Sequence, residues 1–230
     1  AGSCVAGETG PSARKDLELD GVRGGVLESS GYLGIGGVGF FQVSGGFALS
    51  KSTGTITLSD TAATELTVDQ LTLGASNVSA FAGIAGGTLD AVGLELTDVE
   101  FALGIFSDQA DPTRTWAALQ ATAGSFGFIG VEDLSVTGTT LSVSINQAPV
   151  GEDVANFAVN SVAVKTGPSS SKDLDLDGSR GELPELCGNL DIDVFGSFQV
   201  SGGFALSKST GIITLSDISA TELTFDQSTL

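Results

Sequence analysis

The stretch Leu190–Asp217, LDIDVFGSFQVSGGFALSKSTGIITLSD, decides the fold class. From Leu190 to Ser207, apolar residues alternate with polar or small ones, interrupted only at Phe195 and the glycines. A period of two is typical of a strand with one apolar face. At about 3.3 Å per residue, this run would span roughly 59 Å. The glycine pair Gly202-Gly203 is expected to bend the strand or divide it.

The same alternation recurs along the chain, which predicts an all-β fold of long amphipathic strands with few or no helices. Further runs are 56–58, 66–73, 92–96, 99–105, 134–136 and 141–145. The apolar phase slips between Leu96 and Val99 and between Val136 and Leu141, and such slips indicate bulges or turns. One helix is expected over Asp111–Gly124, with a strand through its alternating alanines as the alternative.

A tandem repeat organises the chain. Residues 9–73 align without a gap on residues 166–230, with 45 of 65 positions identical. The period is 157 residues, which predicts a full module at 1–157 and the first part of a second copy at 158–230. Repetition on this scale is typical of elongated arrays. We therefore expect an elongated tandem-repeat array, built as β-sandwich modules or as a β-solenoid-like structure.

Charge and residue types exclude several classes of function. The chain has 28 acidic and 9 basic residues and no histidine, for a net charge of −19. Because a chain with this net negative charge repels nucleic acid, no nucleic-acid partner is expected. No apolar run reaches the roughly 18 residues of a membrane span, so no membrane insertion is expected. Without histidine there is no Ser-His-Asp arrangement, and the chain is not expected to be an enzyme.

An acidic motif supplies the candidate metal ligands. Asp173, Asp175 and Asp177 alternate with leucines and precede a glycine, as in the first half of an EF-hand loop, which binds calcium through oxygen ligands. The twelfth position is Pro184 instead of the expected Glu. The first copy has the corresponding residues Asp16, Glu18 and Asp20, followed by Leu27 at the twelfth position. Two interpretations remain open: a strand whose carboxylates face water, or a site with calcium as the cofactor.

The residue pattern of the repeats resembles that of long tandem-repeat proteins of bacterial surfaces and extracellular matrices. The resemblance rests on strands such as Leu190–Asp217, on turns such as Ser79–Gly87 and on the absence of histidine and methionine. It implies export, an extracellular or cell-surface location, frequent calcium dependence and an adhesin-like or fibre-forming role.

These observations favour a structural repeat segment of an extracellular bacterial filament, sheath or stalk, assembling through β-rich contacts. The alternative is the repeat region of a calcium-dependent surface adhesin that presents a sugar- or surface-binding face. The expected partners are copies of the chain or further repeats of it, and surface glycans for the adhesin.

Two expectations concern single side chains. The alternation predicts that eight apolar residues face a packed core: Phe41, Val43, Phe47, Leu49, Phe198, Val200, Phe204 and Leu206. The two cysteines, Cys4 and Cys187, stand where the other copy has Ser161 and Ser30. The module therefore requires neither cysteine, and whether the two form a disulfide is left open.

Overall fold

The computed structural model describes residues 3–10, 13–19, 27–37, 40–214 and 222–229, with side chains described for 27–36 and 40–208. Throughout these ranges the chain is all-β, which confirms the all-β part of the expected fold class; the elongated array stays a prediction. The one helix in these ranges is the 3-10 turn η2, Gly178–Arg180. The strands are β1 Ser3–Gly10, β2 Ala13–Leu19, β3 Leu27–Gly37, β4 Phe41–Thr57, β5 Glu65–Ile84, β6 Val92–Asp108, β7 Thr115–Ile129, β8 Leu134–Gln147, β9 Val162–Lys165, β10 Ser171–Leu174, β11 Leu183–Val194, β12 Phe198–Thr214 and β13 Glu222–Thr229.

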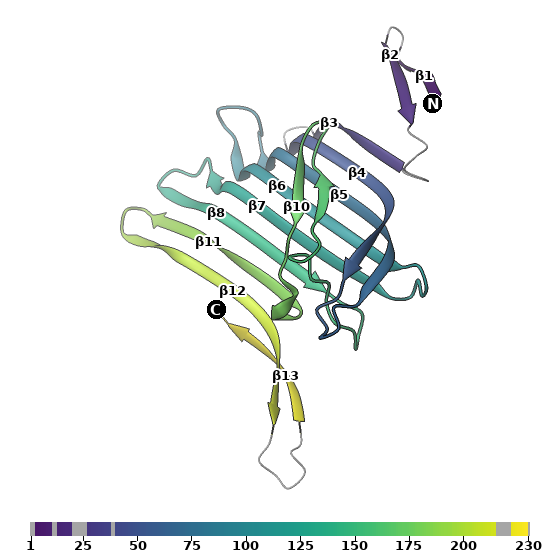
Figure 1. Cartoon of the computed structure of the whole chain (residues 1–230). Helices are drawn as coiled ribbons and strands as arrows, with labels where there is room; N and C mark the ends of the chain where they lie inside the picture. The colour runs from purple at the N-terminus through teal and green to yellow at the C-terminus, as the bar shows by residue number, and fades with distance from the viewer. Residues whose placement is uncertain (1–2, 11–12, 20–26, 38–39, 215–221, 230) are drawn as a thin grey trace.

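Nine of these strands form one antiparallel sheet, in the order β13-β12-β11-β8-β7-β6-β5-β4-β3. Neighbours in the sheet are consecutive along the chain except at β8 and β11. Between these two, the chain leaves the sheet to form the β9–β10 hairpin, which crosses in front of it in Figure 1. Strands β1 and β2 form a separate two-stranded sheet. The main sheet is therefore an antiparallel meander that is interrupted once, by the β9–β10 hairpin between β8 and β11.

The β9–β10 hairpin lies on one side of the sheet, which we name the covered face; the opposite side is the open face. Small residues make the covered face of β4 and β5. The Ser76 hydroxyl donates to the backbone oxygen of Thr166 at 3.1 Å. A Cβ added to Gly74 would lie 2.2 Å from the backbone oxygen of Lys165. The hairpin can approach this closely only because the sheet presents glycine and serine to it.

The core lies at one end of the covered face. Phe106 of β6 and Trp116 of β7 are fully buried there, and the Phe106 ring stands 5.3 Å from that of Phe157. Leu174 and Leu176, after the hairpin turn, pack into the same cluster. The core therefore joins the sheet to the segment that follows β8.

The predicted core residues of β4 and β12 lie on the open face, so that prediction is wrong for the single chain. Phe198 is 58 % exposed, Val200 47 % and Phe41 47 %. Leu49 and Leu206 are also exposed, whereas Val43, Phe47 and Phe204 are partly buried. The strands alternate as expected, but the hairpin covers the face with the smaller residues.

The helix expected over Asp111–Gly124 is also wrong, and the strand alternative is confirmed. The Asp111 carboxylate accepts hydrogen bonds from the amide and hydroxyl of Thr113, at 3.1 and 2.6 Å, which closes a turn before β7. Trp116 and Ala118 are buried on the covered face, in a period of two.

The sequence repeat recurs in strand pairing. Glu28 lies opposite Ser50, and Glu185 opposite Ser207, a shift of 157 residues in both strands. The hairpins β1–β2 and β9–β10 share one register in the same way. Because β11 pairs with β8, strands from both copies belong to one sheet. The division into modules at residue 157 stays a prediction.

Candidate functional site

The acidic motif forms an exposed edge of the second copy. Leu174 and Leu176 are buried, whereas Asp173, Asp175 and Asp177 are exposed between and beside them. This is the arrangement in which the carboxylates face water. In the part of the chain that the structure describes, no three acidic or cysteine side chains are grouped to hold a metal ion.

The carboxylates of the motif have separate partners. Asp175 accepts a hydrogen bond from the Gln120 side chain at 2.7 Å. Asp177 accepts from the amide and hydroxyl of Ser179, both at 2.8 Å, and these bonds, the amide first, lower the pKa of Asp177. The motif as it stands is therefore a poor fit to a calcium site, and calcium binding stays a prediction.

The first-copy candidates cannot be compared in the same way. Asp16 and Glu18 belong to β2, whose side chains lie outside the described set, and Asp20 lies outside the described residues.

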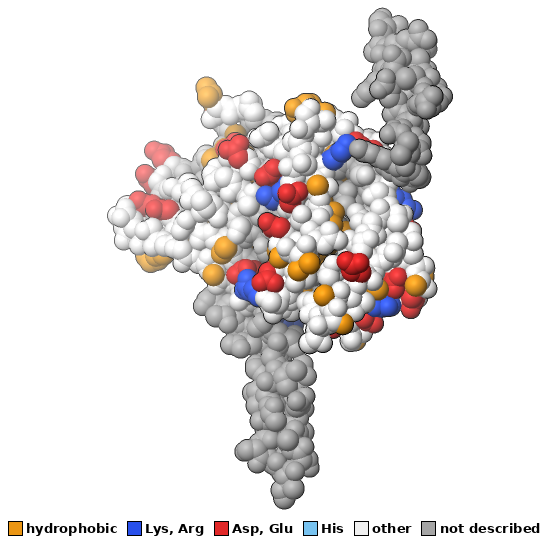
Figure 2. All heavy atoms as spheres, in the orientation of Figure 1, with side chains coloured by type: hydrophobic (Ala, Val, Ile, Leu, Met, Phe, Trp, Pro, Cys, Tyr) orange, Lys and Arg blue, Asp and Glu red, His pale blue; other side chains and the backbone are white. Residues whose placement is uncertain are grey.

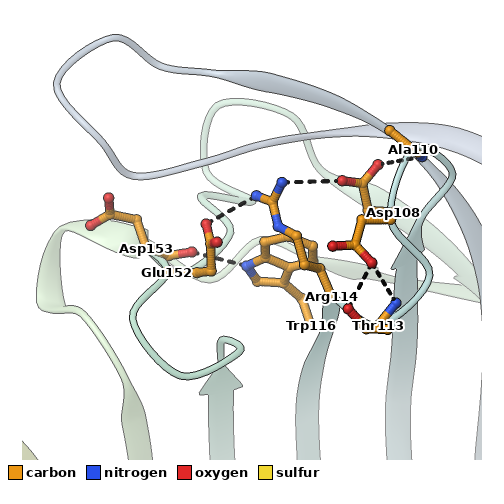
Figure 3. Close-up of polar contacts among 8 residues, drawn as sticks. Asp108, Ala110, Thr113, Arg114, Trp116, Glu152 and Asp153 are labelled. Atoms are coloured by element: carbon orange, nitrogen blue, oxygen red, sulfur yellow. Dashed lines mark hydrogen bonds and ion pairs between the residues drawn. The ribbon is translucent and has the colours of Figure 1, made fainter.

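A polar cluster around Arg114 is the feature that the sequence did not reveal. Its guanidinium bridges Asp108 Oδ2 at 3.2 Å and Glu152 Oε2 at 2.9 Å (Figure 3). It also lies over the Trp116 ring, 5.2 Å from the centroid, and the indole N–H donates to the backbone oxygen of Asp153 at 2.9 Å. Because Arg114 and Glu152 are 38 residues apart, no local pattern in the sequence pointed to their pairing.

The Arg114 cluster is best understood as a structural clamp. Both nitrogen termini of the guanidinium are engaged by carboxylates, and Asp108 is 4 % exposed. The contacts tie the segment after β8 to the turn between β6 and β7. The paired charges therefore connect two segments that are far apart along the chain.

The open face is the candidate functional surface. Cross-strand neighbours form rows that are apolar from β4 to β12, because residues opposite each other point to the same side of a sheet. One row is Phe41, Ala82, Leu94, Phe128, Val136, Ile192 and Val200. A second row is Phe47, Ala75, Phe101, Ala121, Val143, Leu186 and Leu206. Val143, Leu186 and Leu206 of the second row, with Ile145 and Pro184, line a shallow and mainly apolar trough that Glu185 and Lys208 also border.

The size of the open face sets it apart from an ordinary surface. The seven strands from β4 to β12, about 4.8 Å apart with about 12 residues each, give this part of the sheet a footprint on the order of 1,300 Å², across which the apolar rows run. Apolar patches on monomeric proteins rarely exceed a few hundred Å². The opposite side differs: Figure 2 shows acidic and basic side chains scattered over it and hydrophobic ones only in small groups. The open face is therefore a surface suited to a partner.

Comparison with known proteins finds no family model, curated relative or solved structure that matches the chain. Of the described segments, none is a helix long and apolar enough to cross a membrane.

Proposed function

We propose that this chain is a structural repeat segment of an extracellular bacterial filament, sheath or stalk that assembles through β-rich contacts. The observation that carries the proposal is the pairing of β8 with β11, which places strands of both copies in one sheet. The hairpins of each copy share one register under a shift of 157 residues. A sheet that continues from one repeat to the next is the simplest way to build a long, stiff element.

The open face supports lateral assembly. Its extent exceeds the roughly 800 Å² that each partner contributes to a standard protein interface. The two rows carry no charge, and Lys51 and Asp69 lie outside them on the same face, so two such faces can meet along the rows without placing most of the net charge of −19 in the contact. We infer that a second copy of the same sheet covers it. The acidic covered side then faces water and keeps the assembly soluble.

Electron microscopy of the purified chain tests the proposal. Filaments or laterally paired sheets are the expected result, and they should persist in the presence of a chelator. A monodisperse, compact particle at high protein concentration would overturn the proposal. Separate rods that associate only with calcium and a glycan surface would favour the adhesin alternative instead.

A further inference from the structure

Among the described strands, β3 has one edge that no other strand pairs with. It pairs with β4 on one side, from Leu27–Lys51 to Gly37–Phe41, and it ends the main sheet among the described strands. Natural edge strands are protected by short length, proline or several charges. β3 is 11 residues long, carries Glu28 as its single charge and contains no proline. Its free backbone groups are therefore open to another strand.

The second copy shows what lies at the corresponding edge. Strand β11 is the repeat counterpart of β3, and it pairs with β12 just as β3 pairs with β4. Its other edge is occupied by β8, antiparallel, from Leu183–Asn146 to Val194–Leu134. The Cys187 thiol and the Ser142 hydroxyl lie 2.9 Å apart across this pair. Ser30 is the counterpart of Cys187, so a serine pair would take the same place.

A glycine in β3 gives independent support. β8 bulges opposite Gly188, where Thr140 has a positive φ of 54° and the register shifts between Cys187 and Asn189. A Cβ on Gly188 would lie 3.3 Å from Leu141 Cα, which is a tight contact. Its counterpart Gly31 has nothing within 4 Å of the same position. A bulged β8-type strand at the β3 edge would account for glycine at residue 31.

We propose that the free edge of β3 binds a strand with the sequence of β8, Leu134–Gln147, supplied by another repeat. The inference rests on the proposed function and names its partner strand and register. Shifting the β11–β8 pairing by 157 residues places Ser30 opposite Ser142 and Ile35 opposite Val136 of the incoming strand. The main-chain hydrogen bonds supply affinity, and the bulge at Gly31 sets the register.

Disulfide trapping of a synthetic peptide tests this register. The peptide is Leu134–Gln147 with lysines added at its ends for solubility, and it carries cysteine in place of Ser142. The full chain carries Ser30→Cys, with Cys4→Ser and Cys187→Ser, the residues of the other copy. We expect this pair to crosslink about tenfold more than a peptide with cysteine in place of Ser144, which the register places opposite Glu28. The Ser142→Cys variant, with native Cys187, calibrates the efficiency of a matched pair within the chain.

Two valine variants test the role of the bulge. Gly31→Val is expected to fold normally, since its side chain meets open space, but to weaken peptide binding about tenfold or more by contact with the bulge. Gly34→Val is the matched control. Gly34 also has open space around it, and its counterpart Asp191 carries a side chain opposite Thr137 of β8. This variant should bind the peptide as the parent chain does.

Crosslinking without register preference, or equal binding by the two valine variants, would overturn the proposed edge. The outcome is separable from that of the proposed function. If filaments form but the peptide fails to crosslink, the proposed filament function stands and the proposed β3 edge contact is wrong. If the chain captures the peptide but forms no filaments, the β3 edge contact is supported and the proposed filament function is wrong.

Discussion

At the scale of single residues, aspartates in the connections between strands close turns. Asp60, Asp111 and Asp177 each accept hydrogen bonds from the amide and hydroxyl of a serine or threonine two or four residues on. For Asp60 and Asp111, the hydroxyl bond is the larger cause of a lowered pKa. Short polar side chains that bind their own backbone are the ordinary chemistry of turns.

These carboxylates should make stability depend on pH in the acidic range. A pKa that is lower in the folded than in the unfolded chain stabilises the fold above the unfolded value, about 3.9. That contribution is lost as the pH falls through the lower, folded value. We expect Asp111→Asn to show a shallower loss of urea stability than the parent chain between about pH 4 and 2. Thr113→Val, which removes one donor, should show a smaller change of the same sign, and identical slopes would contradict the assignment.

Truncating one phenylalanine in the core and one on the open face should distinguish the two environments. Phe106→Ala removes a fully buried ring and should cost about 3–5 kcal/mol in the free energy of unfolding. Phe204 is partly exposed on the open face, so Phe204→Ala should cost about 1 kcal/mol or less. Chemical denaturation of the unassembled chain measures both, and equal costs would show that the open face is covered within the chain.

The acidic motif yields a prediction about calcium. Carboxylates at alternate positions repel one another, so a divalent cation near Asp173 and Asp175 would relieve that repulsion. Weak binding is expected to raise the thermal midpoint of unfolding relative to the chain with chelator. Asp173→Asn should reduce the difference, and an unchanged midpoint with and without calcium would dismiss the prediction.

At the scale of elements, the β9–β10 hairpin determines which face of the sheet is covered. Its backbone passes directly over Gly74 and Gly46, and its side chains Val164 and Leu174 enter the core. A larger residue under the hairpin would have to push it away. The packing of this element therefore depends on the absence of side chains as much as on contacts.

Gly74→Val should detach the hairpin locally. The added Cβ would lie 2.2 Å from the backbone oxygen of Lys165, and we expect a cost of about 1–3 kcal/mol. Hydrogen exchange of the β9 and β10 amides should become faster, while that of β6 changes little. Gly36→Val, which meets open space in β3, is the control and should leave both unchanged.

At the scale of the whole molecule, the chain has two dissimilar sides. The covered side holds the hairpin, the Arg114 clamp and the exposed carboxylates, whereas the open face carries apolar rows that cross the sheet from β4 to β12. An apolar face of this extent is stable in water only when another layer covers it. If copies associate as proposed, we expect them to do so through the open face.

Adjacent residues of β12 test that orientation. Leu206 is 43 % exposed on the open face, and Ala205 is exposed on the covered side. Leu206→Asp should weaken self-association about tenfold or more, because it would bury a carboxylate without a partner. Ala205→Asp adds the same charge and should have little effect. Sedimentation velocity over a range of concentrations compares them, and equal effects would place the interface elsewhere.

The sequence by itself determined the strands and their repetition. A period of two, as in Leu190–Ser207, is a local property of the backbone and can be recognised without knowing the tertiary contacts. The sequence also placed apolar and small residues on opposite faces. It left the segment around Trp116 undecided between helix and strand, since a short apolar run suits both.

Only the tertiary structure decided which face is covered. Alternation defines two faces but does not say what packs on them. Burial energy alone favours the face with the larger side chains, such as Phe198, as the core. The hairpin instead selects the face where Gly74 and Ser76 allow close approach. The clamp between Arg114 and Glu152 has the same origin. Contacts between residues far apart along the chain arise from folding in three dimensions, and no local pattern encodes them.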